Sequence, residues 1–112
     1  MATLERRRLG RTGLEVTRIG FGALEIGRDW GLGEGVARRR PEAEEAGRTL
    51  NGVLDLGINL IDTARAYHGS EERIGVFLAA RRNEYVLATK AGEHSEEPRT
   101  YSVAVGTLGV ET

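Results

Sequence analysis

Short apolar runs alternate with segments of helical periodicity through most of this chain, and that order limits the possible folds more than any other feature. Strand-like runs lie at 19–24, 58–61 and 84–90. Between them, apolar residues recur at helical spacing within 43–54 and 74–78. Strands that alternate with helices predict a parallel sheet with right-handed crossovers. We therefore expect an α/β fold.

Helix boundaries are predicted by proline, glycine and acidic residues. Pro41 suits the first turn of the first helix, and Gly57 suits the position just after its end. Gly47 and Gly52 are each expected to weaken this helix by about 1 kcal/mol relative to alanine. Ser70 is predicted to cap the second helix, because its hydroxyl precedes two glutamates. The predicted apolar stripes comprise Ala43, Ala46, Leu50, Val53 and Leu54 in the first helix and Ile74, Phe77 and Leu78 in the second.

Glycine-rich or polar segments flank these elements. Residues 1–17 are predicted to form a β-hairpin, with glycines that supply the positive φ of a tight turn. Residues 27–40 have no periodicity and are interpreted as a loop. Residues 93–100 are polar, and for residues 101–112 a weak strand and a frayed helix are both compatible with the pattern. The chain is thus divided into a hairpin (1–17), a βαβαβ unit (18–92) and an uncertain tail (93–112), within a single domain.

Composition excludes several functional classes. Sixteen basic residues against seventeen acidic ones give a formal net charge of −1, which offers no electrostatic reason to bind nucleic acid or an anionic membrane. The arginine triplets Arg6–Arg8 and Arg38–Arg40 are interpreted as solvated faces. The absence of cysteine excludes disulfides and thiolate catalysis, and no metal site is predicted. Neither a signal peptide nor a membrane helix is evident, so a cytoplasmic location is expected.

Asp62, Tyr67 and Lys90 are the candidate catalytic residues. Asp62 ends the second strand and Lys90 ends the third, and neighbouring parallel strands bring their carboxyl ends to one edge of the sheet. Tyr67 lies on the loop just after Asp62. A phenol is a weak acid in water, and a neighbouring ammonium favours its ionised form. The trio is therefore suited to general acid catalysis, with Tyr67 as the donor, Lys90 tuning it and Asp62 holding Lys90.

Three sequence blocks resemble the N-terminal part of the aldo-keto reductase family in order and spacing. They are GRTGLEVTRIGFGA, VLDLGINLIDTARAYHGSEERIG and YVLATKAG. The resemblance runs from about Leu9 to Gly92. It implies the N-terminal portion of a (β/α)8 TIM barrel with an N-terminal β-hairpin, made of about three parallel strands and two helices. It also implies NADP(H)-dependent reduction of an aldehyde or ketone to an alcohol. In that reaction Asp62, Tyr67 and Lys90 would be three members of the family's catalytic tetrad.

The same resemblance implies how the cofactor is held. Gly22, Ala23 and Leu24 would line the nicotinamide, together with Asp62. An aromatic residue is common in the family where Leu24 stands, and glycine is usual where His68 stands. The family's main phosphate-binding loops follow later strands of the barrel and would lie beyond this sequence.

Two departures from the family bear on function. The fourth tetrad member is a histidine after the fourth strand, and neither His68 nor His94 stands at that position. The chain also has fewer than half of the roughly 250 residues of a complete barrel, so it looks truncated, with open sheet edges that would let copies associate. A non-catalytic binding or assembly module, and a fragment without independent function, are therefore alternatives to a reductase. The expected partner of a reductase is a small-molecule carbonyl substrate.

Overall fold

The computed structural model describes residues 3–31, 37–96 and 100–103. Its strands are β1 (Arg6–Arg8), β2 (Glu15–Thr17), β3 (Phe21–Gly22), β4 (Trp30–Gly31), β5 (Ala37–Arg38), β6 (Leu60–Asp62), β7 (Val86–Ala88), β8 (Glu93–Glu96) and β9 (Thr100–Val103). Its helices are α1 (Ala43–Asp55), α2 (Ser70–Leu78) and the 3₁₀ helix η1 (Ala79–Glu84). The predicted order of strand, helix, strand, helix and strand is present.

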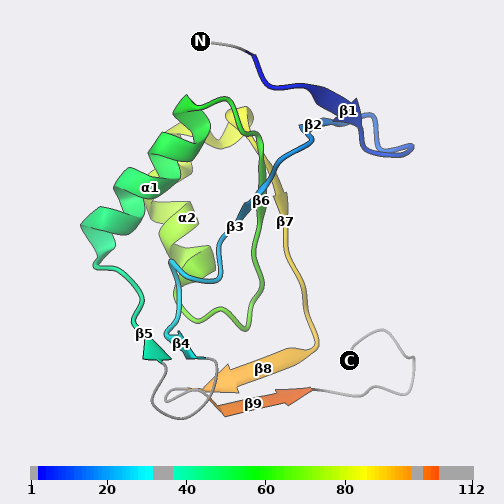
Figure 1. Cartoon of the computed structure of the whole chain (residues 1–112). Coiled ribbons are helices and arrows are strands. Elements are labelled where there is room, and N and C mark those ends of the chain that lie inside the picture. The colour runs from blue at the N-terminus through cyan, green and yellow to red at the C-terminus, as the bar shows by residue number, and fades with distance from the viewer. Residues whose placement is uncertain (1–2, 32–36, 97–99, 104–112) are drawn as a thin grey trace.

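Three parallel strands form the sheet that carries the candidate site. Their spatial order is β3–β6–β7, with Phe21 beside Ile61 and Ile61 beside Leu87. Both helices cover the same side of this sheet, and the antiparallel β1–β2 hairpin lies near the amino-terminal ends of the strands (Figure 1). The prediction of a parallel α/β sheet is therefore confirmed.

The hydrophobic core lies between the sheet and the two helices. Leu50 and Leu54 of α1 pack there with Ile74 and Leu78 of α2, against Ile61 in the central strand. All five side chains are buried, which agrees with most of the apolar stripes predicted for the two helices. Ala43 was also predicted to belong to the first stripe but is exposed at the start of α1, so that part of the prediction is wrong. The helices are amphipathic because only this side of each one meets the sheet.

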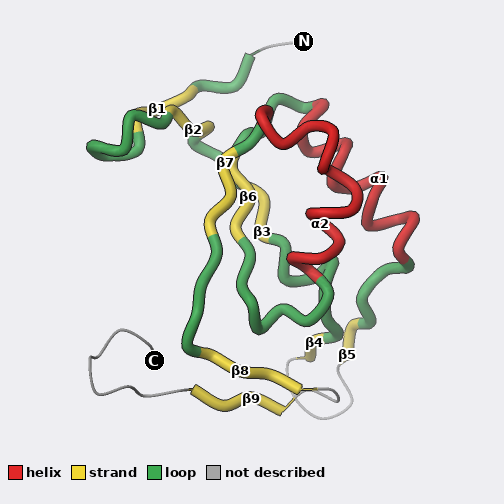
Figure 2. Tube along the Cα trace, turned by 180° about the vertical axis from the view of Figure 1, so that it is seen from behind, coloured by secondary structure: helices red, strands yellow, loops and turns green. Residues whose placement is uncertain are grey.

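The other face of the sheet is not covered by a helix of the described residues (Figure 2). Alternation along the strands places Leu60, Asp62, Val86 and Ala88 on this face, and each of them is only partly buried. Within the described residues, β3 and β7 each have one strand neighbour, so both edges of the sheet are open. The expected open edges are therefore present.

Helix α1 ends in a Schellman motif. Gly57 has a φ of +93°, its amide donates to the carbonyl of Leu54 at 2.9 Å, and the amide of Ile58 donates to the carbonyl of Val53 at 3.3 Å. These two bonds satisfy carbonyls that the last helical turn leaves unpaired. The prediction that the helix stops before Gly57 is confirmed.

The starts of both long helices differ from the prediction. Pro41 lies outside the first turn of α1, because Glu42 is the N-cap residue, with the extended backbone that this position requires. Ser70 is the first residue of α2 and follows the N-cap Gly69, and its side chain makes no capping hydrogen bond. The Ser70 hydroxyl turns inward instead, where the residue is completely buried.

The segments interpreted as loop and tail contain short antiparallel pairs. β4 pairs with β5 over two residues each, within the segment predicted to be only a loop. Strands of two residues are too short to show the alternation of apolar and polar residues by which a strand is predicted. β8 pairs with β9 in the first part of the tail and lies beyond the carboxyl ends of the sheet strands (Figure 1). The last part of the tail, 104–112, lies outside the described residues.

Across the ranges that the structure describes, no helix has both the length and the apolar character required to span a bilayer.

Candidate functional site at the carboxyl ends of the strands

The carboxyl ends of β6 and β7 bring Asp62 and Lys90 together. Lys90 Nζ donates to Oδ1 and to Oδ2 of Asp62 at 3.1 Å each, and to the carbonyl of Thr63 at 2.9 Å. Asp62 is the last residue of β6, whereas Lys90 lies two residues beyond the end of β7 rather than at its end. Lys90 is the only lysine in the chain. The structure therefore joins two of the three candidate catalytic residues directly.

Tyr67 lies on the loop between β6 and α2, and two cations lie against its ring. Lys90 Nζ is 5.2 Å from the ring centroid, and Arg28 Cζ is 5.1 Å from it. Arg28 also donates from Nη1 to the carbonyl of Ala66 at 3.0 Å, so that it contacts both the ring and the backbone of this loop. A guanidinium over an aromatic ring contributes roughly 1 kcal/mol of attraction. Sequence reasoning missed Arg28, because no motif marks this residue and it comes from the distant segment after β3.

The electrostatics of the site keep Lys90 protonated. Partial burial lowers the pKa of the Lys90 ammonium, but a hydrogen bond to Asp62, the charges of Tyr67 and Asp62, and a hydrogen bond to Tyr67 outweigh that effect. The pKa of Lys90 is therefore raised above the ordinary value of a lysine. The site therefore holds a permanent positive charge beside the ring of Tyr67.

A buried pair of hydroxyl groups positions the loop that carries Tyr67. Ser70 Oγ donates to the carbonyl of Ala23 at 2.8 Å. Ser70 Oγ and Thr63 Oγ1 lie 2.6 Å apart, and because Ser70 has already used its single proton, Thr63 is the donor. All three residues are almost completely buried. These bonds join the end of β3, the residue after β6 and the start of α2, which explains why Ser70 does not cap its helix.

Gly27 allows two loops to meet backbone to backbone. Its carbonyl accepts hydrogen bonds from the amide of Gly69 and from Arg40 Nη1, both at 3.0 Å. A Cβ atom added to Gly27 would collide with the carbonyl of Tyr67 and with the amide and Cβ of Ser70. The loop after β3 and the loop after β6 can therefore approach this closely only because position 27 has no side chain.

The residues predicted to line a nicotinamide differ in their exposure. Gly22 is exposed, and a Cβ built on it would meet no atom within 4 Å, so open space lies beside it. It pairs in the sheet with Asp62, and Leu24 nearby is partly exposed. The Ala23 side chain is completely buried in the core, and its amide donates to the carbonyl of Asp62 at 2.8 Å. Gly22 is thus the most exposed of the predicted positions, whereas Ala23 has a structural place in the core.

A small hollow lies beside the candidate catalytic residues. It has a volume of about 50 Å³ and is lined by Ala64, Ala66, Tyr67 and Lys90. This is enough for a water molecule, or for a group of similar size such as a carbonyl oxygen. A much larger cavity, of about 730 Å³, lies at the opposite ends of the strands and contains none of these residues.

Neither histidine of the chain follows a fourth parallel strand of the described residues. His68 follows Tyr67 and has a φ of +46°, in the left-handed region that favours glycine, which agrees with the family's usual glycine at this position. His94 lies in β8, of which only the backbone is described. No group of three or more histidine, aspartate or glutamate side chains suited to a metal ion occurs within the described ranges.

The hairpin, the three parallel strands and the crossover helices together form the N-terminal portion of a (β/α)8 barrel. The model of the Aldo/keto reductase family matches residues 18–105. The chain therefore belongs to the aldo/keto reductase family, and the resemblance noted in its sequence is confirmed.

Individual relatives and solved structures agree with this assignment. The chain is 39% identical over 102 residues to L-galactose dehydrogenase of Arabidopsis thaliana, a match that covers 86% of this chain and 29% of the relative. It is similar to the crystal structure of a putative aldo-keto reductase from Pseudomonas aeruginosa, with a TM-score of 0.74, 38% identity, and 93% of this chain and 37% of that one covered. It is also similar to the holo form of an aldo-keto reductase from Bacillus halodurans, with a TM-score of 0.72, 29% identity, and 96% and 33% covered. The chain thus spans about a third of the length of these proteins.

Proposed function

We propose that this chain carries the proton-donating centre of an NADP(H)-dependent carbonyl reductase, with Tyr67 as the proton donor. One observation carries the proposal: a single ammonium, that of Lys90, bonds both oxygens of Asp62 and lies against the ring of Tyr67. Family membership supports oxidoreductase chemistry of a general kind. The substrate class is an aldehyde or a ketone, and the choice of NADP(H) follows the resemblance to the family.

In this reaction each residue has a separate role. NADPH, when bound, would supply the hydride that reduces the carbonyl carbon. Tyr67 donates its phenolic proton to the carbonyl oxygen as negative charge develops there, which completes the alcohol. The charge of Lys90 stabilises the phenolate that remains, and Asp62 holds the ammonium in place by accepting two hydrogen bonds. Arg28 restrains the ring by lying against it.

The residues of the chain fit the nicotinamide end of the cofactor. The space beside Gly22 is open, and the absence of a side chain there lets a flat ring approach the backbone. Gly22 and Asp62 are direct neighbours in the sheet, so a ring at this place would lie on the same edge as Tyr67 and Lys90. We assign no residue of this chain to the phosphate groups of the cofactor.

The direct test compares two matched tyrosine variants. The purified chain is mixed with NADPH and a simple aromatic aldehyde, and consumption of NADPH is followed by absorbance. Tyr67→Phe is expected to lower turnover by about 10²- to 10⁴-fold while cofactor binding, measured by NADPH fluorescence, is retained. Tyr85→Phe is the control, because Tyr85 lies at the opposite ends of the strands, against Arg82. Turnover that is equal in both variants would contradict the proposal.

A second arm asks whether the centre works within a complete barrel, since the chain spans about a third of its relatives. Residues 18–92 replace the matching segment of the Pseudomonas aeruginosa protein, and the same two variants are made in the chimera. We expect the chimera to reduce aldehydes and Tyr67→Phe alone to abolish this activity. A folded chimera that binds NADPH, but in which Tyr67→Phe has no effect, would exclude Tyr67 as the proton donor.

A further inference from the structure

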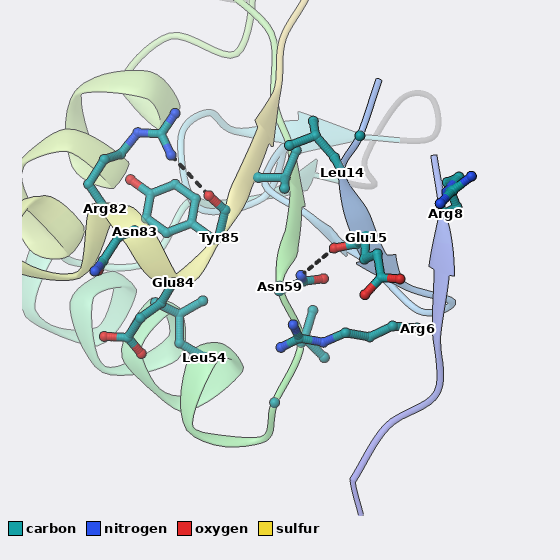
Figure 3. A pocket seen from close by; sticks show the side chains of 14 residues that line it. Arg6, Arg8, Leu14, Glu15, Leu54, Asn59, Arg82, Asn83, Glu84 and Tyr85 are labelled. Carbon is teal, nitrogen blue, oxygen red and sulfur yellow. Dashed lines mark hydrogen bonds between the residues drawn. The ribbon is translucent and has the colours of Figure 1, made fainter. Parts of the chain in front are cut away.

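A broad groove lies at the amino-terminal ends of β6 and β7, away from Asp62, Tyr67 and Lys90. Its volume is about 730 Å³, within the range of sites that bind small organic molecules. Three segments form its walls: the β1–β2 hairpin, the end of α1 with the loop into β6, and the junction of η1 with β7 (Figure 3). Neither the family resemblance nor the proposed reaction gives this groove a role.

Hydrogen bonds fix the walls of the groove relative to one another. Asn59, at the start of β6, donates from Nδ2 to the carbonyl of Glu15 at 2.9 Å and accepts at Oδ1 from the amide of Thr17 at 2.6 Å. Asn59 and Thr17 are both buried. The hairpin is therefore bonded to the body of the sheet, and the groove between them is preformed.

Guanidinium groups face the groove from two of its walls. Arg6 and Arg8 are two residues apart on β1 and therefore lie on the same face of the hairpin, the face of their register partners Thr17 and Glu15. Figure 3 shows Arg6 extending from β1 toward Asn59. Arg82 belongs to the wall formed by the junction of η1 with β7.

Arg82 is held in a defined orientation. It donates from Nη1 to the carbonyl of Tyr85 at 2.9 Å, and its Cζ lies 4.8 Å from the centroid of the Tyr85 ring. A guanidinium fixed in this way loses less conformational freedom when it binds a ligand with its remaining N–H groups.

The positive charge of the groove is not neutralised by its own carboxylates. Within the described ranges, Arg6 and Arg8 form no ion pair, although Glu15 is the direct register partner of Arg8. The other carboxylate of the lining, Glu84, is already bonded at both oxygens by Arg81, at 2.9 and 3.0 Å. The groove therefore presents three guanidinium groups against one unpaired carboxylate.

From these observations we infer that the groove is a binding site for a small organic anion that carries carboxylate or phosphate groups. Guanidinium groups bind both kinds of oxyanion through paired, charge-assisted hydrogen bonds. Leu14, which lines the groove and is exposed, would contact the carbon body of the ligand. This inference goes beyond the proposed function and does not depend on it, because no candidate catalytic residue lines the groove. It also departs from the interpretation of Arg6–Arg8 as a merely solvated face.

The test is a titration of the full chain labelled with ¹⁵N, followed by NMR. Inorganic phosphate and succinate are used as separate probes, with sodium chloride holding the ionic strength constant. We expect saturable shifts of the amides in 6–8 and 82–86 and no shift in 62–67. The probe that binds more tightly identifies phosphate or carboxylate as the preferred group. Shifts that do not saturate with either probe, or that follow ionic strength alone, would overturn the inference.

Matched variants show whether the arginines bind the probe. Arg6→Gln and Arg8→Gln are each expected to weaken binding by about fivefold. Arg11→Gln is the control, because Arg11 belongs to the same hairpin but does not line the groove. Equal weakening in all three variants would mean that the probe responds to net charge rather than to this site, and would refute the inference.

Discussion

Asn59 and Thr17 bond each other in both directions across the joint between the hairpin and the sheet. The amide of Thr17 donates to Oδ1 of Asn59 at 2.6 Å, and the amide of Asn59 donates to Oγ1 of Thr17 at 3.2 Å. Each side chain thus satisfies a backbone group of the other element, in a place that is buried from water. This pair therefore holds the hairpin to the sheet through buried polar contacts.

Asn59→Ala should therefore destabilise the chain strongly. The change leaves the amide of Thr17 and the carbonyl of Glu15 without their partner, at an expected cost of about 2–4 kcal/mol in the free energy of unfolding. Urea denaturation followed by circular dichroism measures this loss. Asn83→Ala is the control, since Asn83 is exposed, and it should change stability by no more than about 0.5 kcal/mol. Similar losses in the two variants would contradict the structural role of Asn59.

Two glycines of α1 should respond oppositely to alanine. A Cβ at Gly47 would lie 2.5 Å from the ring of Phe77 in α2, whereas a Cβ at Gly52 meets no atom within 4 Å. Gly52→Ala should stabilise the chain by up to about 1 kcal/mol through helix propensity. Gly47→Ala should destabilise it by about 1–2 kcal/mol, because the forced shift of Phe77 outweighs the same gain.

Thermal denaturation of both glycine variants decides this point. In a Phe77→Leu background, where the ring is absent, Gly47→Ala should lose most of its penalty. If Gly47→Ala stabilised the original chain as much as Gly52→Ala does, the close approach of α1 and α2 would be wrong.

Ser70→Ala should weaken the loop that carries Tyr67. It removes the donor to the carbonyl of Ala23 and leaves the hydroxyl of Thr63 unpaired in a fully buried place, so we expect a loss of about 1–3 kcal/mol. Thr63→Val should cost a similar amount, and the double variant should cost less than the sum of the two, because both changes break the same bond. Strict additivity in chemical denaturation would show that the two hydroxyls act independently.

Lys90 should give the stability of the chain a distinct dependence on high pH. Its pKa is raised on folding, so its contribution is fully present below the unfolded value of about 10.4 and is lost as pH rises through the higher folded value. Stability of the unmodified chain should therefore fall above about pH 10.4 by a step that Lys90→Met lacks. The step should be small, because the side chains of Lys90 and Asp62 are both 51% exposed.

The measurement is a set of urea midpoints from about pH 8 to about pH 11 for the two proteins. Because Lys90 is the only lysine, no other ammonium side chain contributes to the difference between them. Parallel curves over the whole range would show that the ion pair adds nothing to stability.

Much of the fold and the contact of Asp62 with Lys90 could be predicted from the sequence. The period of the apolar residues distinguished strands from helices, and parallel strands end at the same edge, so residues at the ends of neighbouring strands had to approach each other. Gly57 was equally predictable, since glycine is the usual residue where a helix ends with a positive φ.

Other features depend on contacts that the sequence does not display. A serine before two glutamates looks like a helix cap whether its hydroxyl turns toward the helix or, as Ser70 does, toward the carbonyl of Ala23. Gly47 and Gly52 are the same residue type in one helix, and only the position of Phe77 distinguishes them. Arg28 reaches Tyr67 through the folded loops rather than through any spacing along the chain.

The absence of a side chain at Gly27 has a consequence for how this site can vary. In a library that samples every substitution, the chemical character of the new side chain would decide which replacements around Tyr67 are tolerated. At position 27 the size of the side chain alone would decide, because even alanine would push apart the two loops that meet there. The most restricted position near the tyrosine is therefore one that takes no part in its chemistry.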